Sequence, residues 1–296
     1  MIRIISIIFF SYSSCWCGYI YYICTMKVLV ACEESQIVTI ALRELGIEAY
    51  SNDILDCSGN HPSWHIKDDV FNIINDGWSA MIGFPPCTDL AVSGAAHFER
   101  KRADGSQRAS IEFFMRLYTA DIPYIALENP VGIISGEYVK KYFPDLCEKY
   151  SLPIKPTQII QPYYYGDPVT KKTCLWLKGF PELTHKQENY AQGSKYIESP
   201  SGRRYPEWCW NTGGGSGKVR SKTFPGIAKA MARQWGSFLS WKNPDITPYI
   251  AGLRGDALSE VLFWKEVRSS ELLVFMNYVK TGESPDHAHR LTKNWK

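Results

Sequence analysis

The chain has 296 residues, of which 45% are hydrophobic, 14% aromatic and only 21% charged. This composition excludes an intrinsically disordered protein, and the length favours one domain with a small lobe or tail over two large domains. The 33 Lys and Arg residues against 30 Asp and Glu give a net charge of +3, which is too weak to identify a nucleic-acid-binding protein. Any basic binding surface must therefore come from local clustering.

The first 25 residues differ from the rest of the chain. No charged residue occurs between Ile4 and Thr25, a run long enough for a membrane anchor or a signal peptide. Ser and Tyr residues dilute this run, and Met26 and Lys27 then lead directly into an apolar strand. We therefore expect Met26 to be the natural start, with residues 1–25 as upstream sequence read in frame. A membrane anchor at residues 4–25 is the less favoured alternative.

The cysteines and histidines form no recognisable framework. The 9 cysteines include no C-x-x-C pair, and the 6 histidines are scattered. Neither pattern is typical of a zinc site or of a regular set of disulfides. We therefore expect a cytoplasmic protein that holds no metal.

The predicted elements alternate between strands and helices. A helix is expected at 35–46, capped by Ser35 and ended by Gly46. Such alternation predicts a Rossmann-like, doubly wound, mostly parallel sheet. Ligands bind at the carboxyl ends of the strands in such sheets, so the residues after each strand are the candidates for function. The expected strands lie at 27–32, 47–50, 80–83, 124–128 and 173–177.

Composition divides the chain further. Residues 178–222 are polar, glycine-rich and low in helical periodicity, which indicates a small irregular lobe. Helical spacing returns at 224–241 and at 258–280. We expect a main domain of residues 26–177 and 223–242, a lobe of residues 178–222 and a helical tail of residues 243–296.

Two motifs at strand ends carry the candidate chemistry. Cys87 follows two prolines directly after the strand at 80–83, in a stiff loop that would hold a nucleophile in place. Glu128, followed by Asn129 and Pro130, ends the next strand. Its carboxyl group could face the same crevice as Cys87, and an apolar strand end favours the protonated form of a carboxyl group. The pair predicts a nucleophile beside a proton donor.

The order of three short motifs resembles the cysteine and glutamate motifs of the DNA cytosine-5 methyltransferases: GFPPC is followed by TDLAVSG and later by ENP. The similarity covers residues 26 to about 240. The resemblance implies a compact enzyme of phage or restriction-modification type, acting as a monomer on double-stranded DNA. It would transfer a methyl group from S-adenosylmethionine to C5 of a flipped-out cytosine. Cys87 would attack C6, which makes C5 nucleophilic, while Glu128 holds N3 and the exocyclic amine.

The resemblance also implies a cofactor site. The segment at 30–35 occupies the place of the family's glycine-rich loop, although it holds no glycine. Asp53 corresponds to the acid that binds the ribose hydroxyls, and Asp69 to the acid that accepts a hydrogen bond from the adenine amine. Glu33 would face the ammonium group, whereas Phe84 and Pro85 would line the pocket. The implied cofactor contacts are Ala31, Cys32, Glu33, Ser35, Asp53, Asp69, Phe84 and Pro85.

Residues 166–173 resemble the family's Gln-x-Arg-x-Arg segment, whose paired arginines support the catalytic pocket. Only Lys171 keeps a cation in register, and a lysine cannot form the planar fork of an arginine. In the lobe, basic and aromatic residues accompany a glycine-rich loop at 213–217, and this combination indicates contact with DNA phosphates. The candidate DNA contacts are Arg203, Arg204, Lys218, Arg220 and Lys222.

Two other functions stay open. A related enzyme could form the same Cys87 adduct but deliver a different one-carbon group or modify another pyrimidine, because the cofactor loop lacks glycine. A DNA-binding relative without turnover would fit the altered segment around Lys171 and the short lobe.

Overall fold

The computed structural model describes residues 26–211, 222–242 and 283–293, together with Ala257, Val261, Phe275, Met276, Tyr278 and Val279. The proposed leader at 1–25, the glycine-rich loop at 213–217 and most of the tail at 243–296 lie outside the described residues. So do two of the predicted DNA contacts, Lys218 and Arg220.

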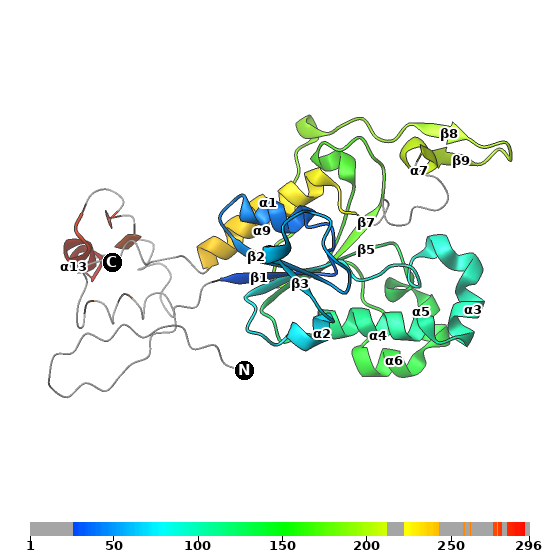
Figure 1. Cartoon of the computed structure of the whole chain (residues 1–296), viewed down its shortest axis with the longest axis horizontal. Coiled ribbons are helices and arrows are strands. Elements are labelled where there is room, and N and C mark those ends of the chain that lie inside the picture. Colours follow the sequence, from blue (N-terminus) through cyan, green and yellow to red (C-terminus); the bar gives the residue numbers. More distant parts are fainter. Residues whose placement is uncertain are drawn as a thin grey trace.

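A seven-stranded sheet forms the centre of the described structure (Figure 1). Its order is β3-β2-β1-β4-β5-β7-β6, with β1 to β5 parallel and β7 antiparallel between β5 and β6. The predicted fold class, a Rossmann-like, doubly wound and mostly parallel sheet, is confirmed. The strands are β1 Lys27–Ala31, β2 Glu48–Asp53, β3 His65–Lys67, β4 Ala80–Gly83, β5 Tyr124–Pro130, β6 Gln158–Ile160 and β7 Thr173–Lys178.

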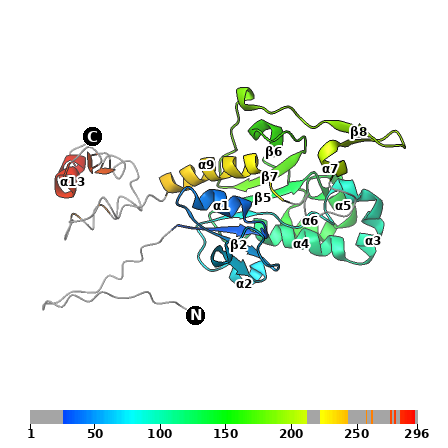
Figure 2. The same cartoon turned by 45° about the horizontal axis from the view of Figure 1, so that its top comes forward.

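Helices cover both faces of this sheet, with α1 and α9 together on one face and α2, α4 and α6 on the other (Figures 1 and 2). The side chains of β1 divide between the faces because successive residues of a strand point to opposite sides. Val28 and Val30 pack with α1 and α9, while Leu29 and Ala31 pack with α4. The helices are α1 Ile37–Arg43, α2 Val70–Ile73, α3 Phe98–Ala103, α4 Ser106–Tyr118, α5 Glu137–Tyr142, α6 Pro144–Tyr150, α7 Glu207–Asn211, α9 Pro225–Lys242 and α13 Pro285–Lys293.

The cap of α1 differs from the prediction. The residue before the helix is Gln36, which has a left-handed backbone with φ of 59° and makes no side-chain cap hydrogen bond. The carboxylate of Glu33 caps the helix instead, accepting hydrogen bonds from the amides of Val38 at 2.6 Å and Thr39 at 3.2 Å. The predicted Ser35 cap is therefore wrong, because the left-handed turn at Gln36 brings an earlier side chain over the helix N-terminus.

The helix predicted at 224–241 is present as α9, and it packs closely on α1. A Cβ at Gly236 would lie 2.3 Å from Cδ1 of Ile47, which follows α1, so a larger residue here would displace that side chain. Trp235 is buried, and its indole nitrogen donates to the carbonyl of Pro181 at 2.9 Å. Helix α9 thus joins the main sheet to the start of the lobe.

The lobe holds more regular structure than predicted. Strands β8 (Tyr196–Glu198) and β9 (Arg204–Pro206) form an antiparallel hairpin, and α7 follows directly. These strands are too short to give a readable alternation in the sequence. The rest of the described lobe is largely irregular, as predicted, while the division of the chain into domains stays a prediction.

In the tail, the structure describes the helix α13, which lies beyond the helical spacing noted at 258–280, and a few helical residues within 257–279. Within the described ranges, no helix is both long and apolar enough to span a bilayer. In the same ranges, no three His, Cys, Asp or Glu side chains form a group that could hold a metal ion.

Candidate active site

Cys87 and Glu128 lie at neighbouring strand ends. Strands β4 and β5 are adjacent and parallel, so the loop that follows β4 meets the end of β5 at the same edge of the sheet. Cys87 is half-buried, and the carboxylate of Glu128 is close enough to raise the pKa of its thiol. The structure therefore brings together the two residues that the motifs singled out.

Hydrogen bonds fasten these two loops to each other. The side chain of Asn129, which is 2% exposed, donates from Nδ2 to the carbonyl of Pro85 at 2.7 Å. The amide of Ile133 donates to the carbonyl of Leu90 at 3.0 Å. A Cβ at Gly132 would lie 2.7 Å from that same carbonyl oxygen, so the close approach depends on a glycine. The nucleophile loop and the end of β5 thus form one unit.

Lys171 lies beside both residues. It precedes β7, and its positive charge lowers the pKa of Cys87 and of Glu128. Its Nζ lies 5.6 Å from the centroid of the Phe224 ring. The structure gathers the predicted trio at one edge of the sheet, and their catalytic roles stay a prediction.

The segment that carries Lys171 is attached to the lobe. The amide of Thr170 donates to Oγ of Ser194 at 2.7 Å, and the amide of Ser194 donates to Oγ1 of Thr170 at 3.1 Å. Neither residue stood out in the sequence, because a reciprocal pair of this kind depends on contact between distant segments. This pair fixes the position from which Lys171 reaches the crevice.

Burial controls the ionisation of this group. It raises the pKa of the Glu128 carboxyl group, and the charge of Lys171 opposes the rise. Burial is also the main cause that raises the pKa of the Cys87 thiol, followed by the charge of Glu128. Oε1 of Glu128 is buried and has no hydrogen-bond partner among the described residues. A carboxyl group that favours its protonated form therefore lies beside the candidate nucleophile.

A narrow pocket opens beside Glu128. Its walls come from the ends of β5 and β7 and from the segment before α9. Lys222, a predicted DNA contact, lies in this wall, with Nζ 3.2 Å from Oγ of Ser58 and 4.0 Å from Oε1 of Glu34. The lining residues are Glu128, Lys171, Thr173, Lys222, Thr223, Phe224 and Ile227.

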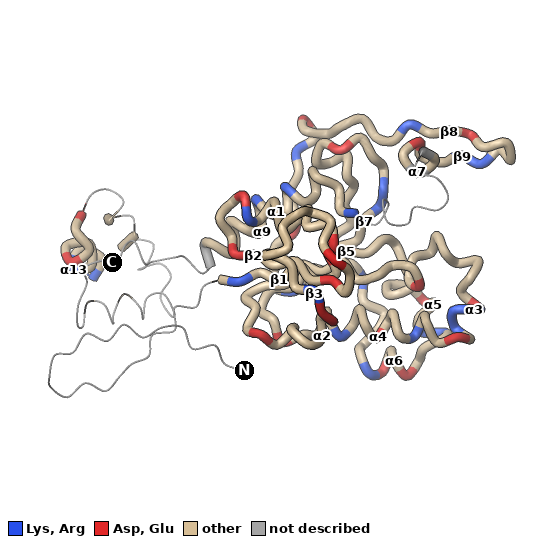
Figure 3. Tube along the Cα trace, viewed as in Figure 1, with Lys and Arg blue, Asp and Glu red and all other residues tan. Residues whose placement is uncertain are grey.

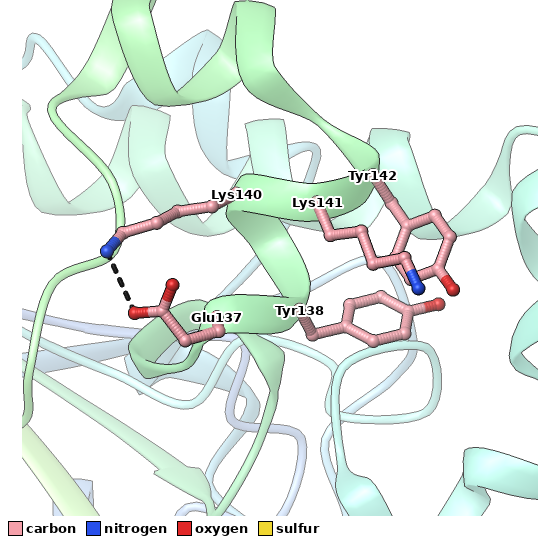
Figure 4. A pocket seen from close by; sticks show the side chains of 5 residues that line it. All are labelled: Glu137, Tyr138, Lys140, Lys141 and Tyr142. Atoms are coloured by element: carbon pink, nitrogen blue, oxygen red, sulfur yellow. Dashed lines mark hydrogen bonds and ion pairs between the residues drawn. The ribbon is translucent and has the colours of Figure 1, made fainter.

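A second, more open hollow is lined by residues of α5 itself (Figure 4). Lys140 forms an ion pair with Glu137 there at 2.8 Å, and the guanidinium of Arg102 lies 4.0 Å from the ring centroid of Tyr142. These charged side chains are already partnered, and the lining residues include none of the predicted catalytic groups. The crevice beside Glu128 is therefore the better candidate site.

The predicted cofactor residues lie at or just after the ends of β1, β2, β3 and β4. Burial raises the pKa of the Cys32 thiol to about 12, and the carboxylates of Asp53 and Asp69 add to the rise. The backbone of Cys32 has φ of 58°, in the left-handed region that glycine enters most readily. The loop without glycine therefore makes its turn at a cysteine. The amide of Phe84 donates to the carbonyl of Ala31 at 2.9 Å and joins this loop to the one after β4.

The acidic residues of this half also have local structural roles. Oδ1 of Asp53 accepts from the amide of Leu55 at 3.0 Å, and Oδ1 of Asp69 accepts from the amide of Phe71 at 2.9 Å as the cap of α2. Burial raises the pKa of Glu33, which caps α1, to about 7. These hydrogen bonds leave the predicted cofactor contacts as predictions.

Glu34 is a candidate site residue that sequence reasoning missed. Its Oε2 is buried and has no hydrogen-bond partner in the described part of the chain. It lies in the loop after β1, between Glu33 and the largely buried Ser35. The only sequence signal for Glu34 was that two glutamates stand side by side. The sequence does not show which of the two carboxylates caps α1.

The charges of the molecule are unevenly distributed (Figure 3). Lys and Arg positions occur on the β8 and β9 hairpin and beside β7, whereas Asp and Glu positions lie near β1, β3 and β5. The predicted DNA contacts Arg203 and Arg204 are exposed on the hairpin. The guanidinium of Arg204 lies 5.1 Å from the ring centroid of Tyr196. The hairpin therefore exposes these arginines together with an acid, Glu198, which is the register partner of Arg204.

Comparison with known proteins gives distant likenesses. No protein-family profile matches the sequence. No curated protein matches it either. Among solved structures, the chain is similar to a protein described as a DNA modification methyltransferase encoded within an E. coli prophage, with 14% identity over 51% of this chain and 46% of that one and a TM-score of 0.35.

Two further solved structures are similar to the chain. They are S. pombe Dnmt2 methyltransferase, with 14% identity, 53% and 50% coverage and a TM-score of 0.33, and Entamoeba histolytica methyltransferase EhMeth, with 16% identity, 56% and 58% coverage and a TM-score of 0.37. The aligned part spans about half the length of these solved chains. Because these likenesses are distant, the function has to be inferred from the geometry of the site.

Proposed function

We propose that the protein transfers the methyl group of S-adenosylmethionine to C5 of a cytosine in double-stranded DNA, through a covalent bond between Cys87 and C6. The observation that carries the proposal is the placement of Cys87 beside Glu128, whose buried Oε1 has no partner among the described residues. The fold supports it, because a doubly wound sheet with one antiparallel hairpin at its edge is typical of methyltransferases that use this cofactor.

The residues of the crevice suit the chemistry of such an attack. The Cys87 thiolate forms a bond to C6, and the displaced electron pair makes C5 nucleophilic. Protonated Glu128 donates to N3 and offsets the negative charge that the attack places on the ring. When bound, the cofactor supplies an electrophilic methyl group for C5. Loss of the C5 proton and departure of the thiolate then restore the aromatic ring.

The residues at the ends of β1, β2 and β4 offer groups that suit this cofactor. The unpartnered Oε2 of Glu34 is an acceptor that the cofactor's ammonium group would satisfy, so we assign that contact to Glu34 in place of Glu33. Asp53 and Asp69 offer acceptors for the ribose hydroxyls and the adenine amine. Beside Asp53, the side chain of Ile54 is 71% exposed and offers an apolar surface to the adenosine.

The hairpin is the proposed DNA-contacting surface. Arg203 and Arg204 are exposed, and the exposed rings of Tyr205 and Trp210 lie 5.7 Å apart between centroids. The arginines suit DNA phosphates, and the rings suit stacking on bases. Lys222 lines the pocket beside Glu128 and is a further proposed phosphate contact. A target base would have to leave the duplex to reach that pocket.

The test is transfer of labelled methyl from S-adenosylmethionine to mixed-sequence duplex DNA, scored by nucleoside analysis. We expect labelled 5-methylcytosine with the unchanged protein and none with Cys87→Ala. Cys147→Ala, which alters a cysteine on α6, is the matched control and should keep full activity. DNA binding without transfer would favour the non-catalytic relative, and transfer that survives in Cys87→Ala would contradict the mechanism.

A further inference from the structure

A lysine that no sequence motif singles out lies buried behind the Cys87 loop. Lys101 of α3 is only 5% exposed, although lysines are almost never buried without a partner. Its Nζ forms an ion pair with Oδ1 of Asp89 at 3.1 Å and donates a hydrogen bond to the carbonyl of Thr88. Since Thr88 and Asp89 directly follow Cys87, this ammonium group holds the two residues next to the nucleophile.

Asp89 is held from three directions. Oδ1 faces Lys101, Oδ2 accepts from Oγ of Ser110 at 3.1 Å, and the main-chain carbonyl accepts from Nε2 of Gln107 at 3.1 Å. Gln107 is fully buried, and its Oε1 accepts from the hydroxyl of Tyr138 at 2.9 Å. Ser110 and Gln107 both belong to α4. The loop after Cys87 is therefore attached to a helix that packs on the central sheet.

The charge of Lys101 also acts on the thiol. The charged groups that face Cys87 are Glu128 at the end of β5, Lys171 before β7 and Lys101 on α3. Burial and Glu128 raise the pKa of the thiol, whereas the two lysines lower it. Because the thiolate is the attacking form, a positive charge at this place favours the reactive state.

We propose that Lys101 is a positioning residue for Cys87. Through Thr88 and Asp89 it fixes the direction of the sulfur, and its ammonium group keeps a positive charge beside the thiolate that attacks C6. The inference rests on the proposed role of Cys87, but the reactivity of the thiol can be measured without cofactor or DNA. Failure of methyl transfer and failure of this inference are therefore separate results.

The test is the pH dependence of Cys87 alkylation by iodoacetamide, in which the thiolate displaces iodide and forms a carbon–sulfur bond. Mass spectrometry of the Cys87 peptide isolates this reaction from that of the other cysteines. Lys101→Met should raise the pH midpoint, because it removes a positive charge that lowers the pKa of the thiol, and Lys101→Gln, which keeps a hydrogen-bond donor toward Thr88, should raise it as well. Asp89→Asn should lower the midpoint, because it leaves the charge of Lys101 uncompensated.

Opposite shifts for the Lys101 and Asp89 variants support the inference, whereas a purely structural role predicts that both loosen the loop and shift the midpoint the same way. Lys149→Met removes an exposed, ion-paired lysine on α6 and serves as the matched control with no shift expected. Circular dichroism and thermal unfolding establish whether each variant folds. If Lys101→Met does not fold, Lys101→Gln is used for the test. An unchanged midpoint in folded Lys101→Gln, or shifts in one direction, would overturn the inference.

Discussion

The catalytic end and the cofactor end of the proposed site are built differently. At the catalytic end, the loops that carry Cys87 and Glu128 are joined by the buried side chain of Asn129 and by backbone hydrogen bonds. At the cofactor end, Asp53 and Asp69 accept hydrogen bonds from amides two residues further along their own loops. The catalytic end is therefore joined by a buried side chain that bridges two strand ends, whereas the carboxylates of Asp53 and Asp69 accept hydrogen bonds only within their own segments.

This difference fits the work proposed for each end. Nucleophilic attack depends on reacting atoms held in a narrow range of distance and direction, so the groups that react gain most from rigid support. Binding of a flexible cofactor tolerates adjustment by the protein. We therefore expect substitutions at the catalytic end to cost more activity than substitutions at the cofactor end.

The largest expected effect is that of Glu128→Gln. Loss of a positioned proton donor should lower the rate of methyl transfer by about 10² to 10⁴. The rate of the unchanged protein should show a bell-shaped pH profile, because it needs protonated Glu128 together with the Cys87 thiolate, and the pKa values of both are raised. In Glu128→Gln the falling limb at high pH should disappear. Glu137→Gln on α5 is the control. A bell-shaped pH profile that persists in Glu128→Gln would exclude Glu128 as the proton donor.

A buried carboxyl group at the cofactor end should contribute, together with buried Glu128, to the pH dependence of stability. Burial raises the pKa of Glu33 from 4.5 to about 7, so its stabilising contribution is complete below pH 4.5 and is lost as the pH rises through 7. The loss corresponds to on the order of 3 kcal/mol in the free energy of unfolding. Urea unfolding at pH 4.5 and pH 8 should show this difference in the unchanged protein and in Glu44→Gln, an exposed control at the end of α1. If the free energy of unfolding of Glu33→Gln differed by the same amount between the two pH values, Glu33 would not be the group responsible.

Asn129→Ala tests the connection between the two catalytic loops. It leaves the carbonyl of Pro85 without its donor, which should lower the free energy of unfolding by about 1–3 kcal/mol. The rate of methyl transfer should fall about tenfold, because the Cys87 loop loses its attachment to β5. Chemical unfolding and the transfer assay measure the two effects. Asn189→Ala, on an exposed turn of the lobe, should change neither.

The smallest expected effect is at the cofactor acids. Asp53→Asn should weaken binding of S-adenosylmethionine about tenfold, the equivalent of about 1.4 kcal/mol, with little change in the rate at saturation. Isothermal titration and the transfer assay separate the two quantities. Asp56→Asn is the matched control on the same loop, where Asp56 pairs with Lys67 at 2.9 Å. If the rate of Asp53→Asn at saturating S-adenosylmethionine fell as much as that of Glu128→Gln, the distinction between the two ends would not hold.

The sequence was sufficient to predict the elements whose signal is local. Strands β1, β4 and β5 are apolar runs, and β1 and β4 end within one residue of the expected positions. The meeting of Cys87 and Glu128 followed from their places after two strands of one parallel sheet. Both inferences needed only periodicity, spacing and the rules of doubly wound sheets.

Other features depend on contacts between distant segments and could not be read in this way. Lys101 stands in the charged run FERKR, which is typical of a solvated helix face, and only Asp89 and Thr88 explain its burial. The cap of α1 depends on a left-handed Gln36, whose buried side chain bonds to Ser51 and His61. Residues that support a site are set by tertiary structure, whereas those that react can be found in motifs.

The most direct test of the proposed mechanism is to trap the bond between Cys87 and C6. The protein is incubated with S-adenosylmethionine and duplex DNA in which 5-fluorocytosine replaces cytosine, since fluorine at C5 prevents the final loss of a proton. We predict a complex that survives denaturation, with the DNA attached to the Cys87 peptide in the mass spectrum and no complex with Cys87→Ala. Formation of 5-methylcytosine in ordinary DNA without any trapped Cys87 adduct would contradict the mechanism.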